Sequence, residues 1–315
     1  MSALDWITQL MEVVAALAAA PLLVGWVNCC RAWLQNRTAP SVLQPYRGIR
    51  KLFHKDAVIA AGASPFFRLA PYVVFGAMVA AAAVIPSMGT RLPFTTAADA
   101  IALVGLFATA RVFQSLAAMD VGTAFGSLGA RREMMVGFLA EPALLMVIFV
   151  ASLISATTSL PAIAEELSTR VIGVYPSLAF TAVAFMMVLL AENARIPVDN
   201  PATHLELTMI HEAMLLEYSA RHLALMEWAA ALKLFNYACI GFALFLPWGT
   251  STGEGPLALA AAIGMLAVKL AVAGAAIAVV ETLSAKLRVF RAPEFLATAF
   301  MLAVLGLLVH VLLKA

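Results

Sequence analysis

Charged side chains are scarce in this sequence. Asp, Glu, Lys and Arg make up 12% of its 315 residues, whereas a soluble domain of this length normally carries about 25%. Hydrophobic residues make up 63% of the chain, and the mean hydropathy is +0.95. This balance argues against a soluble enzyme and favours an integral membrane protein. The net charge of +2 is too small to indicate a nucleic-acid-binding surface.

Cysteine is also rare, with three residues: Cys29, Cys30 and Cys239. They show no CxxC or zinc spacing, and an iron–sulfur cluster normally takes four thiolates. His204 and His211 are seven positions apart, and no HExxH motif is present, so we predict no metal site. Phosphate-binding loops, dinucleotide fingerprints and nucleophile elbows are absent as well. We therefore expect no catalytic residue and no redox cofactor in this chain.

Long apolar runs dominate what is present. A helix needs about 20 apolar residues to cross a bilayer, and eight segments are long enough: roughly 3–30, 67–88, 98–120, 135–159, 172–192, 222–248, 257–283 and 294–314. The first run lacks the basic residues of a secretory signal, so we expect it to be retained as a span. The alternation of apolar and polar residues that is typical of β-barrel strands is absent. The sequence predicts an all-α polytopic membrane protein with about eight spans, in which residues 1–315 form one membrane domain.

The orientation is predicted from Lys and Arg in the loops, which are enriched on the inner side of membrane proteins. With the N-terminus outside, inner loops hold fourteen cations and outer regions three. The fourteen are Arg31, Arg37, Arg47, Arg50, Lys51, Lys55, Arg68, Arg131, Arg132, Arg195, Arg221, Lys286, Arg288 and Arg291; the three are Arg91, Arg170 and Lys314. This asymmetry predicts that both termini lie outside the cell.

Two inner loops are long enough to hold further helices. In residues 31–66, apolar residues alternate loosely with cations along "LQPYRGIRKLFHKDAVI", which is typical of an amphipathic helix at the membrane surface. In residues 193–221, Asn200 and Pro201 resemble an N-cap followed by proline at the first helical position. We therefore expect a short second helix after Asn200.

Ionisable residues fall inside the predicted spans, where they are costly and typically mark ion or proton pathways. Burial raises the pKa of a carboxyl group and a nearby cation lowers it, so alternating acids and bases can relay protons. The predicted proton path consists of Glu141, Glu192, Glu227, Lys233, Lys269 and Glu281. Two simpler interpretations remain: Glu192 forms a local ion pair with Arg195, or the whole set only holds helices together. Arg111 is a further cation within a span.

The inner loop "ENARIPVDNPATHLELTMIHEAMLLEYSAR", residues 192–221, resembles the signature of subunit 1 of respiratory complex I, the membrane subunit that anchors the peripheral arm. The resemblance extends upstream to the "LQP" at residues 43–45 and the "KLFHK" at residues 51–55, and it includes the segment from Arg132 to Glu141. The number of predicted helices also agrees, so the resemblance covers nearly the whole chain.

Departures from the complex I pattern indicate a branch of the family. Val198 replaces the usual Phe, and Ala202 and His204 stand where further acids are usual. The segments "PATHLELTMIHEAMLLEYSAR" and "REMMVGFLAEPALLM" resemble the membrane subunits of group 4 [NiFe]-hydrogenases, the branch that includes formate hydrogenlyase and hydrogenase-4.

This resemblance implies a membrane-anchor and proton-path subunit in a bacterial or archaeal cell membrane. It implies that an inner-face loop contacts the peripheral arm through Arg195, Asp199, Glu206 and Glu217. It also implies four kinds of partner: hydrogenase large and small subunits, a ferredoxin-like iron–sulfur subunit and an antiporter-like membrane subunit. The [NiFe] site and the iron–sulfur clusters would lie in those partners.

Three alternatives stay open at this point. The chain could be a complex I subunit that helps form a quinone chamber. It could be a free-standing secondary transporter, although the repeated halves typical of transporters are not found. It could also be a purely structural anchor. The residues do not distinguish formate, carbon monoxide and ferredoxin as the electron donor, or protons and sodium as the ion moved.

Overall fold

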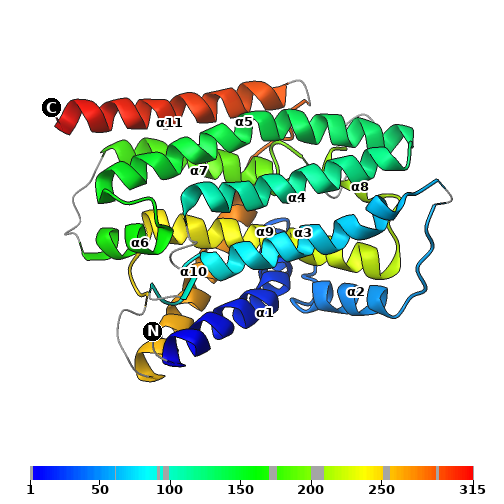
Figure 1. The fold of residues 1–315 in the computed structure, drawn as a ribbon, viewed down its shortest axis with the longest axis horizontal. Helices are drawn as coiled ribbons and strands as arrows, with labels where there is room; N and C mark the ends of the chain where they lie inside the picture. The colour runs from blue at the N-terminus through cyan, green and yellow to red at the C-terminus, as the bar shows by residue number, and fades with distance from the viewer. Residues whose placement is uncertain are drawn as a thin grey trace.

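The computed structural model describes residues 3–60, 62–90, 93–94, 99–169, 176–199, 209–250, 256–288 and 291–314. Across these ranges every named element is a helix, and Asp99 and Ser159 form an isolated β-bridge. Helices run roughly side by side along the longest axis, with both termini toward the same end (Figure 1). The predicted all-α class is therefore confirmed.

The predicted spans correspond to eight helices. Seven are long and apolar enough to cross a membrane: α1 (Ala3–Leu34), α3 (Pro65–Val84), α4 (Ala100–Asp120), α5 (Ala124–Ser155), α9 (Ala220–Phe245), α10 (Pro256–Leu283) and α11 (Ala292–Lys314). The eighth, α7 (Pro176–Glu192), is apolar but has only 17 residues. The count of eight spans is therefore approximate.

Helix α5 begins earlier than expected, at Ala124 instead of 135. The Thr123 side chain caps its first turn by accepting a hydrogen bond from the backbone N–H of Gly126 at 3.3 Å. The basic pair that was expected to precede the span instead lies within this helix, and Arg132 Nη1 donates to the Met209 carbonyl at 2.7 Å. The basic pair therefore did not mark the start of this helix.

The surface helix predicted in the first inner loop is α2 (Gln44–Phe53). Its Ile49 side chain is buried, while Arg47, Arg50 and Lys51 are exposed, as expected for an amphipathic helix. It packs against α1 and α9. In the second inner loop the described helix is α8 (His211–Leu215), and the expected helix start at Asn200 lies outside the described residues. A further short helix that was not predicted, α6 (Leu160–Thr169), packs against α9.

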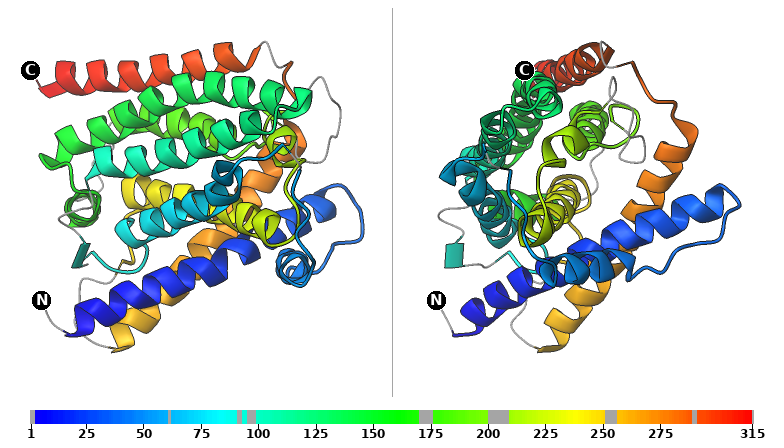
Figure 2. Two further views of the ribbon diagram at one scale, coloured as in Figure 1. Left: turned by 45° about the vertical axis from the view of Figure 1, so that its right-hand side comes forward. Right: turned by 90° about the vertical axis from the view of Figure 1, so that its right-hand side faces the viewer.

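Helix α10 stands to one side of the bundle, where its main neighbour is α1 (Figure 2). Trp26 Nε1 of α1 donates to the Ala271 carbonyl of α10 at 2.9 Å. A Cβ added at Gly274 would lie 2.6 Å from Trp26 Cδ1, so the close crossing of these two helices requires glycine there.

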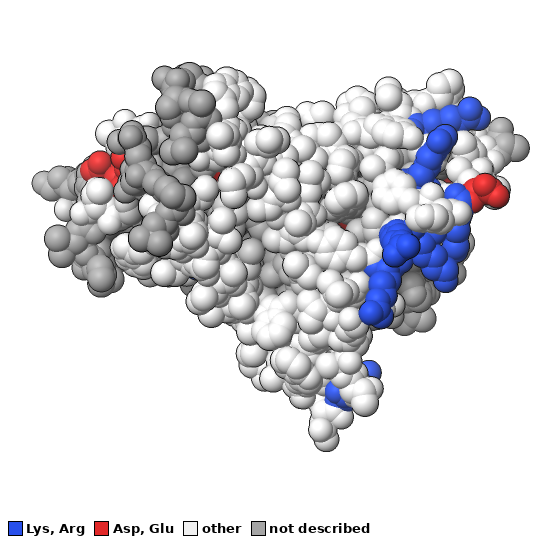
Figure 3. Space-filling model, turned by 90° about the horizontal axis from the view of Figure 1, so that it is seen from below, with Lys and Arg blue, Asp and Glu red and all other residues white. Residues whose placement is uncertain are grey.

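Lys and Arg gather at the end of the molecule opposite the termini (Figure 3). This end carries α2 and α8. The described residues thus reproduce in three dimensions the charge asymmetry that the loops showed in the sequence.

Candidate functional site

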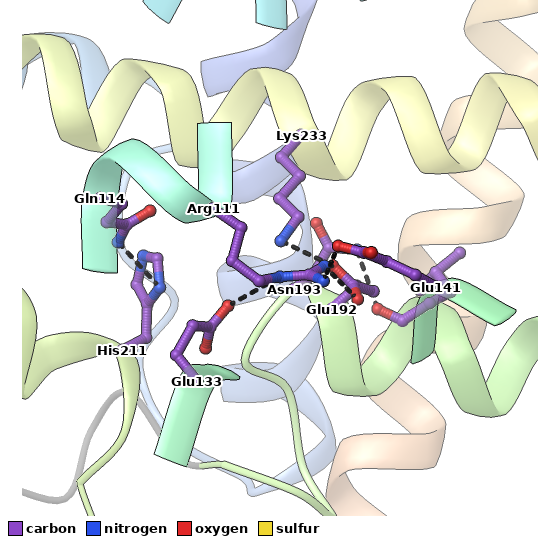
Figure 4. A network of polar contacts seen from close by, with 9 residues as sticks. Arg111, Gln114, Glu133, Glu141, Glu192, Asn193, His211 and Lys233 are labelled. Atoms are coloured by element: carbon purple, nitrogen blue, oxygen red, sulfur yellow. Dashed lines mark hydrogen bonds and ion pairs between the residues drawn. The ribbon is translucent and has the colours of Figure 1, made fainter. Parts of the chain in front are cut away.

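A buried arginine near the middle of α4 lies at the centre of a charged cluster (Figure 4). The Arg111 residue is 6% exposed, and its guanidinium contacts three carboxylates. Nη1 donates to Glu141 of α5, and Nη2 donates to both carboxylate oxygens of Glu192 at the end of α7. Nε lies 3.7 Å from Oε1 of Glu133, also on α5. Lys233 on α9 completes the cluster, with Nζ 2.9 Å from Glu192 Oε2.

These five residues, called here the Arg111 cluster, do not balance in charge. Three carboxylates and two cations leave one negative charge in excess when all are ionised. Arg111 contacts all three acids, so the five residues form one connected set that contains more acids than cations.

The three carboxylates differ in their access to the outside of the molecule. The Glu192 side chain is 1% exposed, Glu133 is 10% exposed and Glu141 is 32% exposed. Glu141 thus faces partly out of the bundle, while Glu192 lies at its centre. The Arg111 guanidinium therefore bonds both to the partly exposed carboxylate of Glu141 and to the buried carboxylate of Glu192.

Local backbone features position these groups. Helix α7 ends directly after Glu192, where Ala194 adopts φ 50° and Arg195 N–H donates to the Leu190 carbonyl at 2.8 Å. On α5, Gly137 lies between Glu133 and Glu141. A Cβ at this position would meet Arg111 Nη1 at 2.2 Å and Arg111 Cδ at 2.6 Å. The guanidinium therefore packs directly on the α5 backbone, at a point that only glycine leaves open.

A cavity of about 380 Å³ opens beside the cluster, between α1, α2, α9 and the segment after α7. Glu192 and Lys233 line it from the cluster side. Its other charged or titratable lining residues are Arg31, Arg195, His211, Glu212 and Glu227. The predicted path residue Glu227 therefore lies on this cavity, which reaches from the segment after α7 to the buried cluster.

Two other predicted path residues lie outside the Arg111 cluster. Glu281 on α10 pairs with Arg195 at 3.0 Å and with Arg31 at 3.6 Å. Glu192 thus does not take Arg195 as its partner, and the local ion pair considered from the sequence is replaced by pairs between distant segments. Lys269 Nζ of α10 donates to the Leu246 carbonyl, directly after the end of α9, at 2.6 Å.

The predicted interface loop is held by polar contacts from several elements. Asp199 Oδ2 accepts from the His211 backbone N–H at 3.2 Å, and Oδ1 lies 3.5 Å from Lys286 Nζ. His211 Nδ1 lies 3.3 Å from Gln114 Nε2 of α4. Glu206 lies outside the described residues, and Glu217 is half-buried beside Tyr218.

Burial raises the pKa of the Tyr218 hydroxyl well above its usual value, and the nearby Asp120 carboxylate raises it further. The Tyr218 ring stacks on Phe67 with centroids 4.1 Å apart. This residue is therefore a neutral packing element beside the predicted interface.

Sequence reasoning placed Arg111 in a span but did not assign it to the path, and it missed Glu133. The spacing Glu133-x₃-Gly137-x₃-Glu141 is a signal that could have found the arrangement. It sets two acids on one helix face with a gap between them. Within the described residues, no group of three or more His, Cys, Asp or Glu side chains could hold a metal ion.

Comparison with known proteins agrees with this architecture. The family described as NADH dehydrogenase matches residues 7–312. The chain is 34% identical over 300 residues to Formate hydrogenlyase subunit 4 of Escherichia coli, covering 94% of this chain and 96% of the relative. It is 34% identical over 244 residues to Hydrogenase-4 component C of the same organism, covering 77% of this chain and 76% of the relative. It is 27% identical over 266 residues to an NADH-quinone oxidoreductase subunit of Cytophaga hutchinsonii, covering 70% of each chain.

A solved structure shares the fold. One chain of the membrane-bound sulfane sulfur reductase, an archaeal respiratory membrane complex, superimposes with a TM-score of 0.84 at 19% identity. The match covers 97% of this chain and 99% of the other. Together, the family match over nearly the whole length and the relatives at 34% identity show that this chain belongs to the NADH dehydrogenase family of membrane subunits, which resemble subunit 1 of complex I.

Proposed function

We propose that this chain is the membrane-anchor and proton-path subunit of a group 4 [NiFe]-hydrogenase complex. The names of its relatives at 34% identity, formate hydrogenlyase subunit 4 and hydrogenase-4 component C, support the hydrogenase branch. Both names denote components of multisubunit assemblies, which favours a subunit over a free-standing transporter.

The observation that carries the proton-path role is the position of Glu192. Its carboxylate lines the cavity next to the inner-face segment, and it is also bonded to the Arg111 guanidinium. Arg111 in turn holds Glu141, whose side chain is 32% exposed. A proton entering through the cavity can therefore reach Glu192 and exchange with Glu141 through rearrangement of one shared hydrogen-bond network.

The ends of this path suggest what it connects. The cavity is lined by Arg195, His211 and Glu212, close to Asp199 of the predicted interface loop. We infer that the peripheral electron-transfer subunits dock over this loop and that an antiporter-like membrane subunit receives protons at Glu141. The [NiFe] site and the iron–sulfur clusters would belong to the docked large, small and ferredoxin-like subunits.

Affinity purification of the tagged chain from its native membrane tests this proposal. We expect a [NiFe] large subunit to co-purify with the wild-type chain. Asp199→Ala removes the acceptor for His211 N–H and the partner of Lys286, so the loop should lose its charge-assisted contacts and the peripheral subunits should be released. Glu165→Ala, an exposed acid on α6, is the matched control and should retain them. Recovery of the wild-type chain without any hydrogenase subunit would overturn the proposal.

Quinone should not be needed for electron transfer in this complex. The motivation is that Ala202 and His204 replace acids usual in the complex I branch. We expect the purified complex in quinone-free detergent to evolve hydrogen from its reduced donor at the rate seen with added quinone. A strict requirement for quinone would instead support a quinone-chamber subunit of complex I.

The orientation in the membrane can be read by cysteine labelling. Arg37 follows α1 and Thr158 follows α5, and both are exposed. In a chain lacking Cys29, Cys30 and Cys239, we expect Arg37→Cys to react with a membrane-impermeant maleimide from the inside and Thr158→Cys from the outside. Reaction of both from one side would contradict the proposed topology, in which both termini lie outside.

A further inference from the structure

A second hollow in the molecule lies between α7, α9 and α10, and it shares no lining residue with the cavity beside the Arg111 cluster. It is a groove of about 420 Å³, within the size range of small-molecule sites, about 300–1,000 Å³. Every lining residue is apolar except Lys269. The groove exists because α10 packs mainly on α1 and stands away from α7.

The ammonium group of Lys269 is the one charge on this groove. Nζ bonds to the Leu246 carbonyl at 2.6 Å and lies 5.8 Å from the centroid of the Phe242 ring. In the described part of the chain, no carboxylate pairs with it. Since an ammonium group has three donors, further bonds to an anionic partner remain available.

The depth of this ammonium group can be judged from α9. This helix has 26 residues and is therefore about 39 Å long, more than the hydrocarbon core of about 30 Å. Leu246 directly follows the end of this helix, and Trp248, which is 44% exposed, comes two residues later. Exposed tryptophan is typical of the membrane–water interface. Lys269 lies at the middle of the 28-residue α10, and its Nζ reaches the carbonyl that follows the end of α9, so its charge is directed toward the interfacial end of the groove. The groove extends from there along Gly241, Ala238 and Leu189.

We propose that this groove binds one anionic phospholipid, with its phosphate on Lys269 and an acyl chain between α7, α9 and α10. The apolar lining fits the hydrocarbon chain, and the cation at the interfacial end, which pairs with no carboxylate of the described residues, fits the phosphate. A transmembrane helix of a partner subunit is the competing occupant. The single cation at one end of an otherwise apolar groove favours a lipid, which has this same division into one charged end and one apolar end.

The test uses the purified complex, reconstituted with phosphatidylglycerol or with phosphatidylcholine of the same acyl chains. Bound lipids are counted by native mass spectrometry. We expect one tightly held phosphatidylglycerol per wild-type subunit. Lys269→Gln should weaken the binding of phosphatidylglycerol about fivefold, which is the contribution of one lysine to anionic headgroup binding. The binding of phosphatidylcholine should be unchanged. Lys269→Arg should retain the preference for phosphatidylglycerol over phosphatidylcholine.

Two α10 variants test the groove itself. Ala276 lines the groove, so Ala276→Phe should fill the acyl-chain site and abolish binding of both phosphatidylglycerol and phosphatidylcholine. Ala267 is exposed on α10 but does not line the groove, so Ala267→Phe should have no effect. Unchanged lipid counts in both Lys269→Gln and Ala276→Phe would overturn the proposal. It would also be overturned if a photoreactive phenylalanine at the groove residue Val272 crosslinked to a partner polypeptide and not to lipid.

Discussion

We expect Glu141→Gln to leave the complex assembled and to lower the ion gradient formed per hydrogen molecule by about tenfold or more. Glutamine can still accept the hydrogen bond that Arg111 Nη1 donates, and it removes the excess negative charge of the Arg111 cluster. Assembly should therefore be preserved. Glutamine cannot take up a proton, however, and loss of a positioned proton-transfer group typically costs about 10²–10⁴-fold in rate. Acidification in proteoliposomes, normalised to hydrogen turnover, measures the effect.

Glu165→Gln provides a matched control, because this acid is exposed on α6 and is not a member of the Arg111 cluster. It should support the full gradient. A Glu141→Gln complex that assembles and also supports the full gradient would remove Glu141 from the path. The shared network would then have to deliver its proton elsewhere, and Glu192→Gln would be the next variant to measure.

Arg111→Met should remove the protein from the membrane. The change leaves Glu133, Glu141 and Glu192 with Lys233 as the remaining cation of the cluster, so the net charge falls from −1 to −2. Removing one partner of a buried ion pair costs about 3–5 kcal/mol, a large part of the total stability of a typical domain, about 5–15 kcal/mol. We expect a severe loss of the chain from membrane fractions and a lower melting temperature for any complex that remains.

A compensated variant separates loss of charge balance from loss of packing. Arg111→Met combined with Glu192→Gln restores the net charge of the cluster to −1, and it should recover a substantial part of the protein in the membrane. Gly137→Ala should resemble a weaker form of Arg111→Met, because its new methyl group would enter the space held by the guanidinium. Normal membrane levels of Arg111→Met would show that the arginine is not needed to hold α4, α5 and α7 together.

The spans were predictable because hydropathy and length are properties of each segment alone. The amphipathic pattern of α2 is equally local, and its buried Ile49 between exposed cations follows directly from the order of residues. Helix α6 was missed because its ten residues are too few to span a bilayer and its burial depends on packing against α9. The start of α5 was missed because charge was taken as a helix boundary, whereas Arg132 instead finds a carbonyl partner on a distant segment.

The ionisable residues were identified from their positions in apolar runs, but their partners were not. Glu141 was assigned to the path without a partner, and the cation that contacts it is Arg111. A local pair of Arg195 with Glu192 was one alternative, and Arg195 instead pairs with Glu281, 86 positions away. Such pairings depend on how helices cross, which periodicity does not specify. The family resemblance identified the loop and the acids, whereas the structure showed that Arg111 bonds to both Glu141 and Glu192.

The single guanidinium that holds both Glu141 and Glu192 also bears on how membrane voltage acts on the protein. Two carboxylates bonded to one guanidinium lie within a few ångströms of each other, so a proton exchanged between them would cover only a small part of a hydrocarbon core about 30 Å thick. An elementary charge crossing the whole membrane exchanges about 2.3 kcal/mol per 100 mV with the field, and so short a step exchanges only a small fraction of that. Voltage would therefore act on entry through the cavity and on the neighbouring subunit, while transfer within the cluster would run at a rate nearly independent of the membrane potential.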